Sequence, residues 1–98
     1  MGFDDIIYLH LIQIPSGHAV SYGYLARMAG YPNHARQVGR VLKHLPQDTS
    51  LPWYRVVNAQ GKISFEPESV KFKEQLSRLQ AEGASIRNNR IIKPSFLG

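Results

Sequence analysis

The first fourteen residues carry apolar side chains at helical spacing. These side chains recur every three or four positions, at Phe3, Ile6, Ile7, Leu11 and Ile14. Asp4 and Asp5 stand near the start, where carboxylates interact favourably with a helix dipole. The pattern therefore predicts an amphipathic helix that ends at Pro15-Ser16-Gly17.

Two more helices follow, separated by a very short connection. Ser21 can cap a helix that ends at Gly30, and Asn33 can cap the next one. Only Tyr31-Pro32 lies between Gly30 and Asn33. Two helices joined by so tight a turn are typical of a helix-turn-helix.

The predicted third helix has one apolar and one basic face. Its apolar positions are Ala35, Val38, Leu42 and Leu45, and its basic positions are Arg36, Arg40 and Lys43. A basic face on the second helix of a helix-turn-helix suits nucleic-acid binding, although an ordinary solvated surface helix has the same periodicity. Gly39 interrupts the helix at a cost of about 1 kcal/mol relative to alanine, which predicts a close backbone approach by a packing helix or a phosphodiester chain.

The second half of the chain predicts a hairpin and a last helix. Arg55-Val56-Val57 and Lys62-Ile63-Ser64 flank the turn sequence Asn58-Ala59-Gln60-Gly61, which favours a short β-hairpin or wing. A helix is expected from near Ser69 to Gly83. It should present Phe72, Leu76 and Leu79 to the core. The apolar residues of the tail, 84–98, should fold back on the body.

Together these elements predict a mainly α, small winged helix-turn-helix domain that comprises residues 1–98 as a single unit. Its 12 Lys and Arg against 7 Asp and Glu give a net charge of +5, which favours polyanionic partners. No apolar run approaches the roughly 18 residues of a membrane span, and no signal peptide is recognisable. The four histidines are dispersed and cysteine is absent, so neither a metal nor a cofactor is expected.

The segment from Leu51 to Ser64 is the most specific motif of the chain. Its Pro52-Trp53-Tyr54-Arg55-Val56 resembles the Pro-Cys-His-Arg-Val motif of the O6-alkylguanine-DNA alkyltransferases, whose cysteine removes an alkyl group from a flipped guanine. Trp53 stands in the place of that cysteine. Because the chain contains no thiol, the resemblance is to the alkyltransferase-like proteins, which recognise alkylated guanine without repairing it.

Further matching segments extend the resemblance over roughly residues 3–83. They are Ser21-Tyr22, Asn33 to Gly39 and Glu82-Gly83, in the order of the family. The resemblance implies the fold of the C-terminal DNA-binding domain of the alkyltransferases. In those enzymes an additional domain precedes this one.

The resemblance also implies roles in DNA binding and base flipping. Tyr22 corresponds to the tyrosine that presses on the phosphate 3′ to the target, and Arg36 to the arginine that fills the vacated space in the duplex. A lone tyrosine more often seals the edge of the core, and a lone arginine is more often a surface charge. The joint spacing of Tyr22 and Arg36 with the signature segment favours the DNA-binding roles instead. The full set of predicted DNA contacts is Ser21, Tyr22, Asn33, Ala35, Arg36, Gln37, Gly39, Arg40 and Lys43.

The predicted lesion pocket contains Tyr22, Trp53, Tyr54, Arg55 and Val56. Trp53 would pack against the alkyl substituent, and Tyr54 replaces the histidine that activates the thiol. A phenol is a poor general base at neutral pH. Arg55 is expected to give support, and Glu82 matches the end of the enzymes' hydrogen-bond relay. With no histidine to orient, Glu82 should pair with Arg55 or a backbone amide.

Two departures from the family leave details open. Leu45 replaces an asparagine that braces the active-site turn in the enzymes. The segment Phe65-Glu66-Pro67-Glu68 corresponds to the loop that closes over the base, and its carboxylates would face a polyanion if they pointed inward. Preferred alkyl size, the repair partner and the role of residues 84–98 are not given by the sequence.

The sequence thus predicts a non-enzymatic sensor that binds double-stranded DNA containing O6-alkylguanine, flips the nucleotide and flags it for nucleotide excision repair proteins. We expect a monomer in the cytoplasm, associated with the nucleoid if the chain is prokaryotic. The alternative is a winged helix-turn-helix regulator that reads base sequence, usually as a dimer on paired half-sites.

Overall fold

The computed structural model describes residues 1–98 and is mainly helical, as predicted. Its helices are α1 (Phe3–Leu11), α2 (Tyr22–Met28), α3 (Ala35–Lys43) and α4 (Val70–Ala81), with a short 3-10 helix η1 (Trp53–Arg55). Its strands are β1 (Val20–Ser21), β2 (Val56–Val57), β3 (Ile86–Arg87) and β4 (Arg90–Ile91). None of the helices has the length and apolar character needed to cross a membrane.

The helix-turn-helix is formed by α2 and α3. The Ser21 hydroxyl accepts a hydrogen bond from the Tyr24 amide at 3.0 Å, and Gly30 leaves the helix with a φ of 90°, as predicted. The prediction that Asn33 caps α3 is wrong, because His34 occupies the N-cap position and makes no side-chain cap. Residues 31–34 form a turn in which the His34 amide donates to the Tyr31 carbonyl, so the helix begins one residue later.

The first helix is shorter than its apolar pattern predicted. It ends at Leu11, and the following turn still buries Ile14, which is only 3% exposed. Apolar side chains in a turn can thus continue the helical pattern when the turn packs on the same core.

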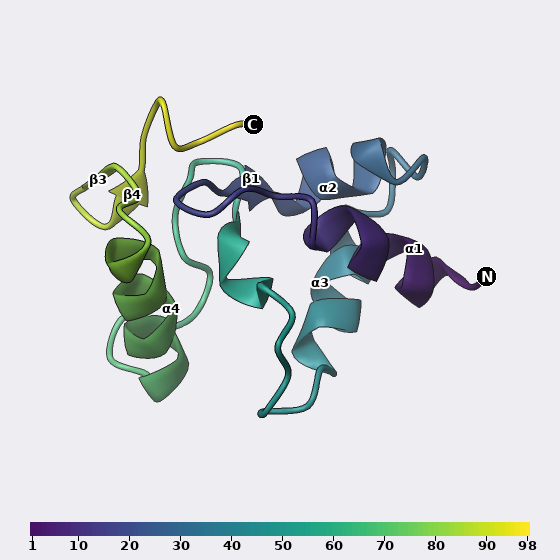
Figure 1. Ribbon diagram of the computed structural model, residues 1–98, viewed down its shortest axis with the longest axis horizontal. Helices are drawn as coiled ribbons and strands as arrows, with labels where there is room; N and C mark the ends of the chain where they lie inside the picture. The colour runs from purple at the N-terminus through teal and green to yellow at the C-terminus, as the bar shows by residue number, and fades with distance from the viewer.

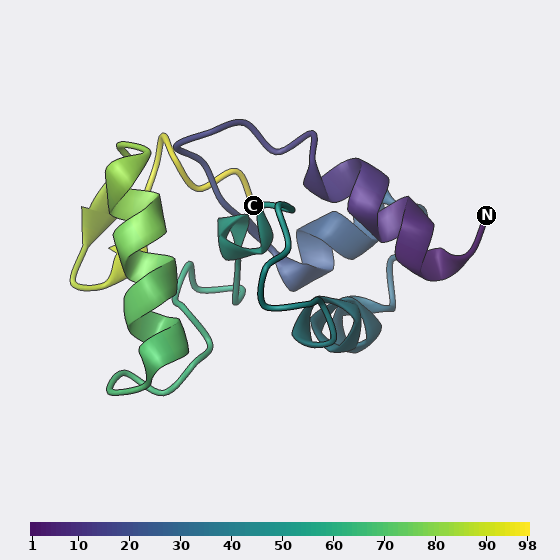
Figure 2. The same ribbon diagram turned by 60° about the horizontal axis from the view of Figure 1, so that its bottom comes forward.

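The core has two parts that occupy opposite ends of the molecule (Figures 1 and 2). The first lies among α1, α2 and α3 and contains Ile7, Leu11, Ile14, Val20, Leu25, Ala26, Val38 and Val56. The second lies beneath α4 and the tail and contains Ala19, Val57, Ile63, Phe72, Leu79 and Ile91. The paired segments at β1 and β2 join the two parts, because neighbouring residues of an extended chain point to opposite sides. Val20 and Val56 belong to the first part, and Ala19 and Val57 belong to the second.

The predicted hairpin between residues 55–57 and 62–64 is wrong. Val56 and Val57 instead pair in parallel with Val20 and Ser21. The turn from Asn58 to Lys62 is present, closed by the Asn58 amide donating to the Lys62 carbonyl at 2.8 Å. Beyond it, Lys62 forms a bridge with Arg90 of the tail rather than with the preceding strand. A distant partner therefore replaces the local one.

The tail supplies the hairpin that the molecule does have, β3 with β4. It packs back on the body, as predicted, and its last residues reach the start of α2. The Ala19 amide donates to the Ser95 carbonyl at 2.9 Å, and the Ser21 hydroxyl donates to the Gly98 carbonyl at 2.7 Å. Helix α4 starts beside Ser69 and Gly83 follows its end with a φ of 82°, which confirms the predicted bounds. The Ser69 hydroxyl caps the helix by accepting a hydrogen bond from the Phe72 amide.

Candidate nucleic-acid interface

A cavity of about 870 Å³ opens between α3, η1 and the start of α4. Six of its lining residues come from the helices of the helix-turn-helix: Tyr22, Ala35, Arg36, Gly39, Leu42 and Lys43. The others are Leu45, Pro46, Gln47, Thr49, Trp53, Val56, Ser64, Phe65, Lys71 and Gln75. The fold thus brings the helix predicted to bind DNA and the signature tryptophan to one hollow.

Trp53 forms part of the cavity wall and is only 8% exposed. The Phe65 ring meets the indole edge to face, with 6.3 Å between ring centroids. The Lys71 Nζ lies 4.3 Å from the centroid of the indole ring. This part of the cavity therefore combines aromatic surface with a positive charge.

Tyr22 lies on the cavity wall where α2 begins. Its hydroxyl makes a 2.8 Å hydrogen bond with the Ser64 hydroxyl, which ties α2 to the segment after the turn. Its ring lies 3.8 Å from the position that a Cβ on Gly39 would occupy. That distance is ordinary van der Waals contact, so packing against Tyr22 does not by itself require glycine at position 39.

The predicted basic face of α3 is exposed. Arg36, Arg40 and Lys43 all lie on the surface, and none of them takes part in an ion pair. Arg36 and Lys43 line the cavity, whereas Arg40 lies outside it. Three unpaired cations on one helix are available to phosphate groups.

The remaining predicted DNA contacts differ in exposure, and not all of them line the cavity. Asn33 is exposed and Gln37 is half-buried, and neither lines the cavity. Ser21 is only 7% exposed, and its hydroxyl is engaged by the Tyr24 amide and the Gly98 carbonyl. Its side chain is therefore used inside the protein.

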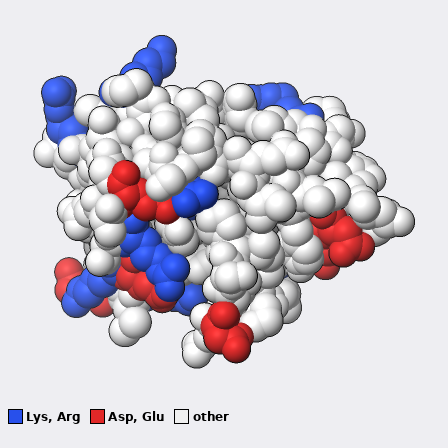
Figure 3. Space-filling view, viewed as in Figure 1, with Lys and Arg blue, Asp and Glu red and all other residues white.

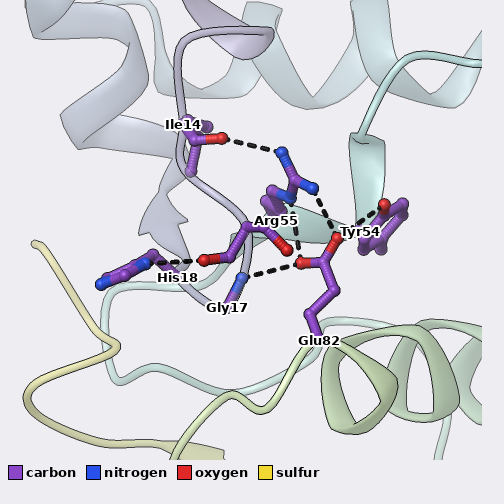
Figure 4. Close-up of polar contacts among 7 residues, drawn as sticks. Ile14, Gly17, His18, Tyr54, Arg55 and Glu82 are labelled. Atoms are coloured by element: carbon purple, nitrogen blue, oxygen red, sulfur yellow. Dashed lines mark hydrogen bonds and ion pairs between the residues drawn. The ribbon is translucent and has the colours of Figure 1, made fainter.

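Tyr54 and Arg55, which were expected in the lesion pocket, do not line this cavity. Their polar groups converge on Glu82 (Figure 4). The Tyr54 hydroxyl donates to Glu82 Oε2 at 2.9 Å, and Arg55 Nε donates to Glu82 Oε1 at 3.0 Å. Arg55 also pairs with Glu82 through Nη2 and donates from Nη1 to the Ile14 carbonyl at 2.8 Å. These bonds draw both side chains to the other side of η1.

Glu82 also accepts the Gly17 amide at 3.0 Å, so the predicted pairing of Glu82 with Arg55 or a backbone amide is confirmed for both partners. Burial by itself would raise the pKa of Glu82, but the bonds from Arg55, Gly17 and Tyr54 outweigh it and lower the pKa to about 2. The hydrogen bond to Glu82 correspondingly raises the pKa of Arg55. The carboxylate is thus held charged as the centre of a structural network.

Gln75 is a cavity residue that the sequence reasoning missed. Its side chain is only 2% exposed, and its Nε2 donates to the carbonyls of Tyr54 at 3.1 Å and Val56 at 2.9 Å. Gln75 therefore ties α4 to η1 and β2. Its position on the apolar face of the last helix, between Phe72 and Leu79, was an available signal, because a polar residue there needs a buried partner.

Lys71 and Ser64 were also not assigned to the pocket, whereas Phe65 begins the segment that the resemblance places over the flipped base. They approach Trp53 and Tyr22 only through the tertiary fold, so local periodicity gave no signal for them. Among the described residues, no group of three or more His, Cys, Asp or Glu side chains could hold a metal ion.

An exposed cationic helix in a helix-turn-helix, with an aromatic cavity beside it, defines a DNA-binding domain able to hold a base outside the duplex. Residues 2–84 match the family model of the 6-O-methylguanine DNA methyltransferase DNA-binding domain. The chain belongs to this family.

Two relatives of this chain are a base-flipping protein and an alkyltransferase-like protein. The chain is 45% identical over 80 residues to a DNA base-flipping protein of Vibrio parahaemolyticus, covering 82% of this chain and 78% of the relative. It is 42% identical over 80 residues to Alkyltransferase-like protein 1 of Schizosaccharomyces pombe, covering 82% and 74%. These similarities confirm the resemblance to the alkyltransferase-like proteins.

The fold is also similar to that of an alkyltransferase-like protein over the whole chain. The crystal structure of S. pombe Atl1 in complex with damaged DNA containing O6-carboxymethylguanine superposes with a TM-score of 0.85 at 34% identity. It covers 100% of this chain and 99% of that one. The predicted fold class is thus confirmed, apart from the misplaced hairpin.

Proposed function

We propose that this protein recognises O6-alkylguanine in double-stranded DNA, rotates the nucleotide out of the helix and holds it against Trp53 without removing the alkyl group. The observation that carries the proposal is the cavity itself, which places Trp53 beside the unpaired cations of α3. Its volume of about 870 Å³ is in the range of small-molecule sites, roughly 300–1,000 Å³.

The chemistry of repair is missing at both positions that would perform it. The chain contains no cysteine, and the indole of Trp53 has no basic lone pair with which to accept an alkyl group. Tyr54, which follows it, directs its hydroxyl to Glu82 rather than into the cavity. Binding is therefore the activity that the residues support.

The cations of α3 supply the affinity for the duplex. Arg40 and Lys43 would contact phosphates, whereas Arg36 lies at the cavity and would occupy the space that the flipped nucleotide leaves. Alkylation at O6 weakens the pairing of guanine and so lowers the cost of flipping. Selectivity would begin before the base reaches Trp53.

A complex with flipped DNA would mark the site for excision repair proteins, and the protein would act as a monomer that bends the duplex. The alternative, a regulator that reads base sequence, leaves the Trp53 cavity without a use. For that reason we favour the damage sensor.

The proposal is tested by titrating the protein with a duplex that contains one O6-methylguanine and with the same duplex containing guanine. Trp53 is the only tryptophan, so its fluorescence reports on a base stacked in the cavity. We expect preferential binding of the methylated duplex with quenching, and the methyl group still on the DNA after release. Equal binding to both duplexes would support the regulator instead.

A further inference from the structure

The wall of the cavity around Trp53 is positively charged. Its lining contains three cationic side chains, Arg36, Lys43 and Lys71, and no aspartate or glutamate. Arg36 and Lys43 belong to α3, the helix that would meet the DNA backbone. Lys71 is different, because it belongs to α4 and its ammonium lies against the indole of Trp53.

The charge of Lys71 is only loosely neutralised within the protein. Its Nζ lies 3.9 Å from Glu74 Oε1, which is too long for a hydrogen bond, and Glu74 also pairs with Arg78 at 3.5 Å. The ammonium group carries three N–H donors, and the contact with one face of the Trp53 ring cannot use all of them. Lys71 therefore retains donors for a group that enters beside the indole.

The carboxylates of the loop before α4 do not neutralise the positive charge of the cavity. Glu66 and Glu68 precede α4 in an exposed loop, and neither belongs to the cavity lining. Figure 3 shows charges of both signs on the side of the molecule where α4 lies, so the surface outside the cavity is mixed. The excess of positive charge is a property of the cavity rather than of this whole end of the molecule.

On these grounds we infer that Lys71 makes the pocket select O6 adducts that end in a carboxylate over neutral adducts of the same size. The inference rests on the proposed function, which directs the O6 substituent at Trp53. A substituent that passes the indole reaches the ammonium group of Lys71. A carboxylate there gains a charge-assisted hydrogen bond in partly desolvated surroundings, whereas a neutral amide gains a weaker one.

Two probes that differ only in charge test this inference. One duplex carries O6-carboxymethylguanine and the other carries its neutral amide, O6-carbamoylmethylguanine, in the same sequence and at the same salt concentration. The wild-type protein should bind the acid about tenfold more tightly than the amide. Equal binding of the two duplexes overturns the inference.

The residue is tested with Lys71→Met, which keeps the apolar stem and removes the charge. We expect the acid-to-amide ratio to fall below about twofold, because the acid duplex should lose more affinity than the amide duplex. Lys71→Arg should retain the preference, which keeps the test decisive if the methionine variant folds poorly. Lys73→Met is the matched control, because Lys73 is exposed on the same helix and lies outside the cavity.

The outcomes separate the inference from the proposed function. If Lys71→Met weakens binding of the acid, amide and unmodified duplexes equally, Lys71 contacts phosphate. That result overturns the inference and leaves the proposed function standing. If wild-type protein binds neither adduct better than guanine, the proposed function fails and the inference fails with it.

Discussion

The two sides of the segment from Trp53 to Val56 have opposite character. Trp53 and Val56 line an open cavity in which two cations of α3, Arg36 and Lys43, have no ion-pair partner. Tyr54 and Arg55 instead face a nearly closed network in which each named polar group has a partner. The side chains of Arg55 and Glu82 are 15% and 14% exposed. One short segment therefore forms a binding surface on one side and a structural support on the other.

The two sides of this segment use their side chains for different purposes. Glu82, which matches the relay glutamate of the alkyltransferases, joins η1 to the turn at Gly17. Its partner Arg55 also donates to the Ile14 carbonyl in the turn after α1. The cavity keeps the features that binding needs, namely aromatic surface and cations. Changes on the network side should therefore alter stability, and changes on the cavity side should alter DNA binding.

The largest effect is expected on the network side, from Glu82→Gln. The change leaves the guanidinium of Arg55 largely buried without its counter-charge, so the free energy of unfolding should fall by about 3 kcal/mol. Urea denaturation near pH 7 measures this loss. Glu74→Gln, on the exposed face of α4, is the control and should change stability by less than about 0.5 kcal/mol.

The same carboxylate should give the protein an acid-sensitive stability. The pKa of Glu82 is about 2 in the folded protein against an ordinary value of 4.5. Its contribution is therefore fully present above pH 4.5 and is lost as the pH falls towards 2, by a total of about 3 kcal/mol. Unfolding measured across this range should lose most of its pH dependence in Glu82→Gln; an unchanged slope would show that other groups cause it.

On the cavity side, Arg36→Ala should weaken binding to a duplex containing O6-methylguanine by about 30-fold, or about 2 kcal/mol. Binding to the damaged single strand should change much less, because only the duplex has a vacated space to fill. Fluorescence titration of both forms checks this. Arg40→Ala, outside the cavity, should weaken both forms alike, and the same pattern in Arg36→Ala would reduce Arg36 to a phosphate contact.

A smaller effect is expected from Tyr22→Phe. The change removes the hydrogen bond to the Ser64 hydroxyl and the contact with the phosphate that the family resemblance assigns to Tyr22. We expect affinity for the damaged duplex to fall about fivefold, or about 1 kcal/mol. Tyr31→Phe is a matched control because Tyr31 packs edge to face against Phe3, away from the cavity lining. Equal losses in the two variants would contradict the assignment.

Gly39→Ala should move stability and binding in opposite directions. A Cβ at this position meets Tyr22 at 3.8 Å, so the free protein should gain about 0.5–1 kcal/mol of stability from better helix propensity. If a DNA strand approaches α3 closely, affinity should nevertheless fall by severalfold. Thermal unfolding and titration test both parts, with Gly23→Ala of α2 as control, since a Cβ there also has room. A gain in stability with unchanged affinity would exclude close approach at Gly39.

The smallest change is expected when a thiol is restored. Trp53→Cys should transfer no detectable methyl group from O6-methylguanine, because Tyr54 stands where the activating histidine would be, and its hydroxyl is bonded to Glu82. Transfer is measured with a labelled methyl group. Efficient transfer by this single variant would contradict our account of activation.

Local sequence determined the features that depend on neighbours within a turn or two. Ser21 and Ser69 cap helices and Gly30 and Gly83 end them, because a side-chain acceptor and a positive φ act on the nearest backbone groups. The absence of cysteine decided that no thiol transfer occurs. The family motifs also placed Trp53 and α3 in one DNA-binding domain.

Only the tertiary structure decided which way each side chain of the signature segment points. The hairpin expected around Asn58 is replaced by parallel pairing with a strand 36 residues earlier, Val20 with Val56. Arg55 and Tyr54 turn away from the cavity because Glu82, 27 and 28 residues later, offers both a partner. Lys71 contacts Trp53 because the fold packs α4 against η1. Such contacts arise from packing between distant segments, on which local periodicity carries no information.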